Sequence, residues 1–304
     1  MTLARFTACL AFLLGLAALA QPAAAAPVCA IGAPGTIQRV AIGETGRSML
    51  IHIPVGVERV RELPLVFLLH GSGGTGAAML DSSGLAATSD HHGFLLAAPD
   101  AGIPVGKGFV WNIPGVPTIT GEIPTAEDPD DVAFLTAAID WLAESGCIDP
   151  ERVYATGLSG GGRMTSWLGC VASDRFAAIA PVVGLRAGNP LASDPQRPDP
   201  ATCQPEHPMP VLAFAGETDT VNPVAGGGAG YWQYSMDAAL ARWAELGDCR
   251  AAPETAALSE TVEEQRYGGC KGRAQVIGRL VAGRGHEWVA DNEAMWYFFW
   301  RHRR

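Results

Sequence analysis

One pentapeptide, Gly157–Gly161, constrains the fold of this chain more than any other segment, because it has the form Gly-x-Ser-x-Gly. The β-branched and aromatic run Arg152–Leu158 leads into it and predicts a strand, and Gly160–Val171 predicts a helix. A serine between a strand and a helix lies in a strained turn whose small neighbours let the backbone pass closely. Its hydroxyl is exposed at a helix N-terminus, where N–H groups favour a developing anion. We therefore predict that Ser159 is a nucleophile; an ordinary glycine-rich turn is the alternative.

A serine hydroxyl becomes a good nucleophile only beside a base. Of the seven histidines, His286 follows the last predicted strand in a glycine-rich loop that would reach the same edge of the sheet as Ser159. The chain order serine, acid, histidine places the acid between these two residues. Asp219 lies in the loop that follows the predicted strand 210–215 and is the predicted acid, which would fix the tautomer of the imidazole. Glu217 is the rival carboxylate.

The rest of the chain alternates between strand and helix patterns. We predict buried strands at 63–70, 94–98, 152–158, 176–183 and 210–215, helices at 130–144, 160–171, 231–246 and 292–300, and antiparallel pairs at 36–43 with 47–54 and at 258–268 with 274–282. This alternation predicts an α/β fold, with a mostly parallel sheet covered by helices on both faces.

A glycine-rich run, His70–Gly74, follows the first long apolar strand. It would supply the backbone N–H of Ser72 to an oxyanion hole whose other donor is Gly160 N–H. The overlapping segment Gly71–Gly76 also fits the G-x-G-x-x-G pattern of dinucleotide-binding proteins, with Asp100 at the end of the next strand. A dinucleotide-dependent oxidoreductase is therefore a distant alternative, but it explains none of the later serine, aspartate and histidine positions. We expect no cofactor.

Two tryptophans are candidates for substrate binding. Trp111 lies in the segment 101–128, which is rich in glycine and proline, and Trp288 comes two residues after His286. Aromatic rings at these positions suit an aryl or polyester substrate, although an isolated tryptophan is as often a packing residue. The sequence has no H-E-x-x-H motif and no clustered metal ligands, so we expect no metal.

The N-terminal residues predict export. Arg5 precedes an apolar run over 6–20, and an alanine run then offers a cleavage site, so residues 1–25 read as a signal peptide; an uncleaved anchor helix is the alternative. Residues 26–304 are expected to form a single catalytic domain, secreted and free of the membrane. The chain has a formal net charge of −10, which makes nucleic acid an unsuitable partner.

Six cysteines remain after residue 25, and an even number in an exported chain predicts three disulfides. Spacing alone leaves every connectivity open. We expect Cys249 to pair with Cys270 across a local loop, and Cys147 with Cys170 because both end helices on one face. Cys29–Cys203 follows by elimination.

Six segments of the chain match a known family in order: LPLVFLLHGSGG, the stretch from DDVAFLTAA to TSWLGC, DRFAAIAPVVG, PVLAFAGETDTVNPVAGGG, YWQYSMDAALARWAELGDC and GRGHEW. With them the chain resembles the feruloyl esterase and polyhydroxybutyrate depolymerase family of secreted α/β-hydrolases. The resemblance implies a serine ester hydrolase that acts through an acyl-enzyme on hydroxycinnamoyl or hydroxyalkanoate esters. It also implies a triad of Ser159, Asp219 and His286.

The chain departs from this family at two positions, Val289 where a proline is common and Ala215 where a histidine is common. It also ends just after the expected catalytic domain, which favours soluble or amorphous esters over a crystalline polymer. Two alternatives share the fold: an acetyl xylan esterase and a binding protein that has lost catalysis.

Overall fold

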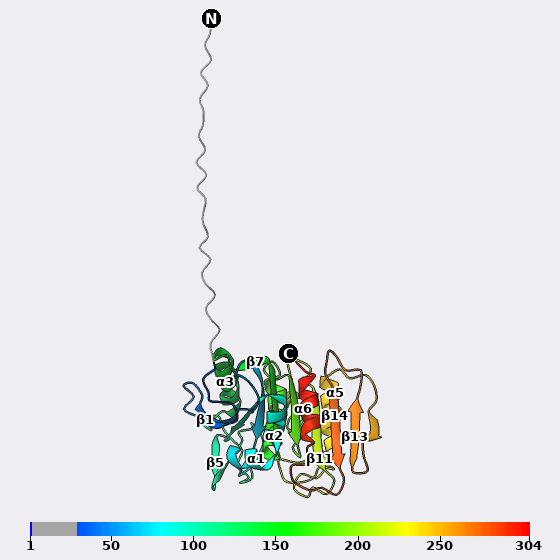
Figure 1. The fold of residues 1–304 in the computed structure, drawn as a ribbon. Helices are drawn as coiled ribbons and strands as arrows, with labels where there is room; N and C mark the ends of the chain where they lie inside the picture. Colours follow the sequence, from blue (N-terminus) through cyan, green and yellow to red (C-terminus); the bar gives the residue numbers. More distant parts are fainter. Residues whose placement is uncertain (2–28) are drawn as a thin grey trace.

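The computed structural model describes Met1 and residues 29–304, so the predicted signal peptide lies outside the described residues. A ten-stranded sheet runs through the molecule in the order β1-β2-β4-β3-β7-β8-β11-β14-β13-β12, from β1 on the left of Figure 1 to β13 on the right. Its strands are β1 (Ile37–Ala41), β2 (Ser48–His52), β3 (Leu63–Leu69), β4 (Leu95–Pro99), β7 (Ile148–Leu158), β8 (Ala178–Val182), β11 (Val211–Gly216), β12 (Glu254–Ala257), β13 (Val262–Tyr267) and β14 (Val276–Val281).

The middle of the sheet is parallel and its edges are antiparallel. Strands β4, β3, β7, β8, β11 and β14 all run in one direction, whereas β1 and β2 at one edge and β13 and β12 at the other pair antiparallel. The predicted mostly parallel sheet is confirmed. Because parallel strands end at one edge, the loops after β7, β11 and β14 all emerge on the same side.

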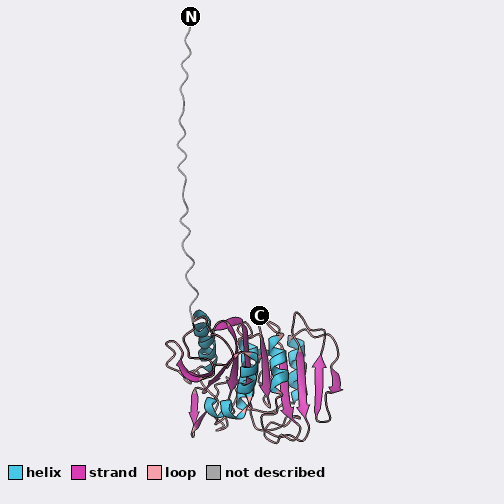
Figure 2. Ribbon diagram, viewed as in Figure 1, coloured by secondary structure: helices cyan, strands magenta, loops and turns pink. Residues whose placement is uncertain are grey.

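Helices cover both faces of the sheet, as predicted (Figure 2). Along β3, Leu65 and Phe67 belong to one core cluster while Val66 and Leu68 belong to the other, since successive side chains point to opposite faces. The first cluster includes residues of α3 (Asp131–Glu144), α4 (Gly160–Val171) and α5 (Met236–Leu246). The second includes residues of α1 (Gly76–Ser82), α2 (Leu85–His92) and α6 (Asn292–Trp300).

The expected helix at 231–246 begins later than predicted. Its first residue is Met236, because the Ser235 side chain caps the helix by accepting a hydrogen bond from Ala238 N–H. The residues before Ser235 form a loop instead. Smaller elements also lie outside the main sheet: β5 (Ile103–Val105), β6 (Gly108–Val110), β9 (Pro190–Leu191), β10 (Asp194–Pro198) and the short helix η1 (Pro200–Thr202).

Three disulfides join the six cysteines. The predicted Cys249–Cys270 pair is present. The other two predicted pairs, Cys147–Cys170 and Cys29–Cys203, are wrong: Cys29 bonds to Cys147, and Cys170 bonds to Cys203. The prediction paired the ends of two neighbouring helices. Each of these cysteines instead meets a cysteine on an irregular segment, whose path no periodicity in the sequence reveals.

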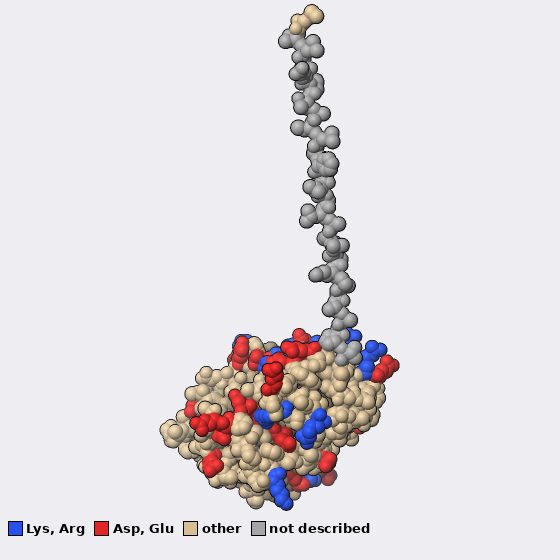
Figure 3. All heavy atoms as spheres, turned by 90° about the vertical axis from the view of Figure 1, so that its left-hand side faces the viewer, with Lys and Arg blue, Asp and Glu red and all other residues tan. Residues whose placement is uncertain are grey.

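The surface carries charges of both signs. On the face shown in Figure 3, lysine and arginine residues are scattered among aspartate and glutamate residues. Within the described part of the chain, no helix has the length and apolar character that crossing a bilayer requires.

Candidate active site

Ser159 lies in a strained turn between β7 and α4. Its backbone has φ 54° and ψ −110°, a conformation that costs a non-glycine residue free energy and clusters at functional sites. Ser159 N–H donates to the carbonyl of Val182 on the neighbouring strand, 2.9 Å away. A Cβ atom on Gly161 would lie 2.1 Å from the carbonyl oxygen of Leu69, so glycine is required there. The motif therefore forms the strained turn, with close backbone packing, that its glycines predict.

Asp219 and His286 form a hydrogen-bonded pair. His286 Nδ1 lies 2.8 Å from Asp219 Oδ2, and the Asp219 side chain is 1% exposed. The other carboxylate oxygen accepts hydrogen bonds from Val221 N–H and Asn222 N–H, both at 2.8 Å. These donors hold the carboxylate in the orientation that fixes Nδ1 as the protonated nitrogen and leaves Nε2 free to accept a proton.

The sheet brings this pair to the edge that holds Ser159. Ser159 follows β7, Asp219 follows β11 and His286 follows β14, and all three strands are parallel. Asn222, beside the acid, donates its side-chain N–H to the carbonyl of Val183, directly after β8. Among the described residues, Ser159 Oγ shares no hydrogen bond with His286 Nε2. Such bonds are often long until substrate binds.

The rival carboxylate, Glu217, has a different role. Its Oε2 accepts a hydrogen bond from Gly283 N–H at 2.9 Å, which ties the loop after β11 to the loop after β14. The structure therefore brings Asp219, and not Glu217, to the histidine.

The glycine-rich loop after β3 lies directly against the start of α4. A Cβ atom on Gly160 would be 2.8 Å from Ser72 N and 2.3 Å from Ser72 Oγ. Gly73 N–H donates to the Phe109 carbonyl, whereas Ser72 N–H has no acceptor among the described residues. Ser72 and Gly160, the two residues predicted to supply backbone donors to an oxyanion hole, are thus in close contact.

Comparisons with known proteins agree with this architecture. Residues 127–187, which include Ser159, match the prolyl oligopeptidase family model. Feruloyl esterase B of Piromyces equi is 28% identical over 83% of this chain, and poly(3-hydroxyalkanoate) depolymerase C of Paucimonas lemoignei is 33% identical over 45% of it. The chain spans only 44% and 31% of the lengths of these relatives. The solved acetyl xylan esterase of Aspergillus awamori has a TM-score of 0.61 and 18% identity, covering 87% of this chain and 99% of its own.

The chain therefore has the α/β-hydrolase fold, and the relatives that it resembles include proteins named feruloyl esterase and poly(3-hydroxyalkanoate) depolymerase.

One residue near the candidate site that sequence reasoning missed is His70, the last residue before the glycines of the loop after β3. Its Nε2 accepts from Ala101 N–H at 3.0 Å, and its Nδ1 lies 2.8 Å from the Gly71 carbonyl. This pattern assigns a neutral ring with the proton on Nδ1. Burial lowers the pKa of His70, which keeps the ring neutral. The signal for it was a polar residue that closes an otherwise apolar strand.

Trp111 does not offer the exposed aromatic surface that was expected. It is 4% exposed, its indole N–H donates to the His70 carbonyl at 2.8 Å, and its ring packs against the His70 imidazole. Trp111 therefore packs against the residue that begins the glycine-rich loop. Trp288 is half-buried, and its indole N–H donates to Asn292 on α6, so its role in binding substrate stays a prediction.

The dinucleotide alternative does not fit the hydrolase fold. Asp100 Oδ1 accepts a hydrogen bond from Gly76 N–H at 2.8 Å, at the start of α1. The carboxylate that would bind a ribose is thus engaged by the helix of its own glycine motif. The strand order also differs from 3-2-1-4-5-6, the order of dinucleotide-binding folds.

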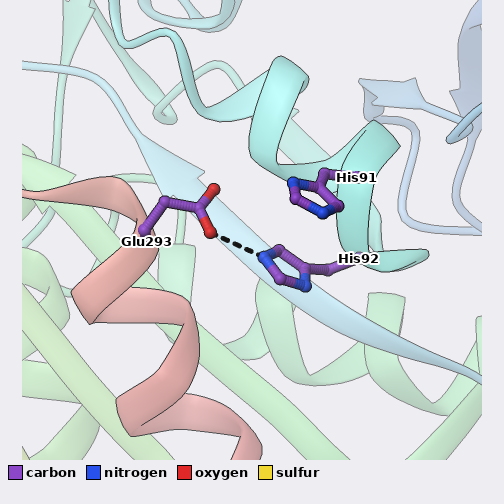
Figure 4. Close-up of side chains that lie close together, drawn as sticks. All are labelled: His91, His92 and Glu293. Carbon is purple, nitrogen blue, oxygen red and sulfur yellow. Dashed lines mark hydrogen bonds and ion pairs between the residues drawn. The ribbon is translucent and has the colours of Figure 1, made fainter.

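One group of side chains that could bind a metal occurs among the described residues, formed by His91, His92 and Glu293 (Figure 4). The two imidazole rings are stacked, with centroids 4.4 Å apart and planes 8° from parallel. A metal lies in the plane of each imidazole that binds it, so one ion cannot satisfy both rings in this arrangement. His92 Nε2 lies 2.7 Å from Glu293 Oε2, and this contact joins α2 to α6.

Proposed function

We propose that this chain is an exported serine ester hydrolase that works through an acyl-enzyme, with Ser159, Asp219 and His286 as its triad. The observation that carries the proposal is the buried Asp219–His286 hydrogen bond at the sheet edge where Ser159 occupies a strained turn. A structural turn needs no such carboxylate and imidazole beside it.

The proposed reaction has two halves. Ser159 Oγ attacks the ester carbonyl while His286 Nε2 takes the hydroxyl proton, and the N–H groups of Ser72 and Gly160 bind the resulting oxyanion. The intermediate collapses to the acyl-enzyme as the histidine protonates the leaving alcohol. Water then attacks the acyl group by the same route, releasing the acid and the free serine. Asp219 stabilises the imidazolium in both halves.

We propose hydroxycinnamoyl or hydroxyalkanoate esters as substrates, because relatives named for these activities align with the chain. Acetylated xylan is the second candidate, since an acetyl xylan esterase shares the fold over almost its whole length. A panel of methyl ferulate, hydroxybutyrate oligomers and acetylated xylan separates the three by kcat/KM.

Export is proposed with residues 1–25 as the signal peptide and 26–304 as one catalytic domain. Three disulfides suit an oxidising compartment. N-terminal sequencing of protein recovered from the medium or periplasm would locate the cleavage.

Covalent labelling tests the nucleophile. A fluorophosphonate should modify Ser159, and Ser159→Ala should lose both label and turnover, whereas Ser259→Ala, an exposed serine between β12 and β13, should keep both. A label found by mass spectrometry on Ser72 or Ser166 would overturn the assignment.

A further inference from the structure

Two buried arginines lie beside the candidate site without a counter-ion among residues 29–304. The buried carboxylate of Asp131 pairs with Arg47, and that of Glu264 pairs with two arginines. Arg163 and Arg186 are only 6% and 7% exposed, yet neither forms an ion pair with any described residue. An unpaired buried charge is costly, so its presence calls for a physical reason.

Arg163 lies one helical turn after Ser159 on α4 and reaches the oxyanion loop. Its Nη2 donates to Ser72 Oγ at 3.2 Å, and the ring of Tyr231 stacks on the guanidinium at 4.1 Å. Its Nε is buried and has no hydrogen-bond partner among the described residues. Burial lowers the pKa of Arg163 to about 10, so the group is still a cation at neutral pH. Within the described residues, its guanidinium makes one hydrogen bond, the one to Ser72 Oγ.

Arg186 adds a second positive charge, but its guanidinium is fixed by a hydrogen bond and by stacking on aromatic rings. Its Nη1 donates to the Tyr234 carbonyl at 2.9 Å, and its guanidinium stacks on the rings of Trp232 and Tyr234. The two arginines line one small cavity of about 20 Å³, with Trp167 in its wall. That volume admits roughly one or two water-sized groups, and Ser72 and Ser159 are not among the residues that line it.

We propose that Arg163 binds a carboxylate on the substrate, so that the ester cleaved at Ser159 is one that carries a second, free carboxylate. This inference rests on the proposed ester hydrolase function. Ser72 joins the two sites, because its N–H is the predicted oxyanion donor and its hydroxyl contacts Arg163. The free carboxylate must therefore lie only a few bonds from the scissile carbonyl. It can belong to the acyl half, as in a dicarboxylic hemiester, or to the alcohol half, as in an ester of a hydroxy acid.

Matched substrate pairs test the proposal and distinguish the two halves. Ethyl hydrogen succinate and ethyl succinamate differ in charge on the acyl side, and 3-acetoxybutyrate and its amide differ on the alcohol side. We expect kcat/KM for the acid to exceed that for the amide by on the order of 10- to 100-fold in one pair, the usual effect of a hydrogen bond to a charged group. The pair that shows the preference identifies the half of the substrate that carries the carboxylate.

The preference should depend on Arg163. In Arg163→Met it should fall to near one, and in Arg163→Lys it should be intermediate, because lysine keeps the charge but lacks the planar fork. Arg39→Gln, which removes an exposed arginine on β1, should keep the full preference. If Arg163→Met does not fold, the lysine variant and the wild-type preference carry the test.

Several results would overturn the proposal. One is a wild-type enzyme that hydrolyses acid and amide equally in both pairs. Another is a folded Arg163→Met in which both substrates lose activity equally, which would make Arg163 a positioning residue for Ser72. If no ester is hydrolysed, the proposed esterase function fails instead. Isothermal titration calorimetry of the acid and the amide with Ser159→Ala then tests whether Arg163 binds a carboxylate. Tighter binding of the acid than of the amide, lost when Arg163→Met is added, supports the anion site, and equal binding refutes it.

Discussion

A single methyl group at the start of α4 should disable the oxyanion hole. In Gly160→Ala the new Cβ would lie 2.8 Å from Ser72 N and 2.3 Å from Ser72 Oγ. The hydroxyl can rotate away, but the backbone nitrogen must withdraw by about 0.6 Å to reach the 3.4 Å of ordinary contact. A donor must lie 2.7–3.1 Å from the oxyanion, so a shift of this size removes it from range. Losing one such donor costs on the order of 10²–10³ in kcat.

The assay is turnover of p-nitrophenyl acetate, with the thermal midpoint measured to show that the variant is folded. Overpacking alone costs about 1–3 kcal/mol in the free energy of unfolding, which leaves a folded protein. The double variant Ser72→Ala with Gly160→Ala is the control, because it removes the hydroxyl clash and retains the backbone clash. It should stay as slow as Gly160→Ala. Near-normal kcat in folded Gly160→Ala, or full recovery in the double variant, would refute the reasoning.

Three further predictions follow from the same structure. Asp219→Asn should lower kcat on the order of 10⁴-fold with the fold intact, since the amide no longer stabilises protonated His286; steady-state kinetics beside circular dichroism checks this. Because burial lowers the pKa of His70 below 6.5, the unfolded state binds its proton more readily, and stability should be full above pH 6.5 and fall as the pH drops below it. Urea titrations at several pH values should show a weaker acid-side loss in His70→Gln than in wild type. Replacing Cys170 and Cys203 by alanine opens a loop with a sequence separation of 33 and should cost roughly 3–4 kcal/mol in the free energy of unfolding; an unchanged urea midpoint would contradict this.

Much of the fold could be predicted because it follows from short-range patterns. The apolar run Leu63–Leu69 has no polar alternation, which is how a strand buried on both faces reads. The positions of Ser159, Asp219 and His286, each just after a predicted strand, then follow from the rule that parallel strands end at one edge. These inferences needed only periodicity and chain order.

The features that were missed depend on tertiary contacts. The start of α5 at Met236 was missed because the segment before it is fixed by contacts with a distant residue, Arg186, which hydrogen-bonds to the carbonyls of Tyr231 and Tyr234. The two wrong disulfides share this cause, since Cys29 and Cys203 lie on irregular segments. The role of His70 was missed because chain order can choose a histidine base after the serine, but it says nothing about which histidine packs against a loop.

Helix α4 carries both the proposed nucleophile and the arginine proposed to bind a carboxylate. Ser159 caps α4 and Arg163 follows one turn later, so the helical period alone places both on neighbouring parts of one surface. Ser159 could be predicted from the sequence, because a strained turn requires glycines at fixed positions around the serine. The role of Arg163 could not be predicted, because an arginine on a helix is usually exposed to solvent. Only the structure shows that Arg163 packs against Tyr231 and has no carboxylate partner among the described residues. A candidate nucleophile can therefore be predicted from spacing, whereas the proposed preference for a charged substrate depends on which distant segments cover the helix.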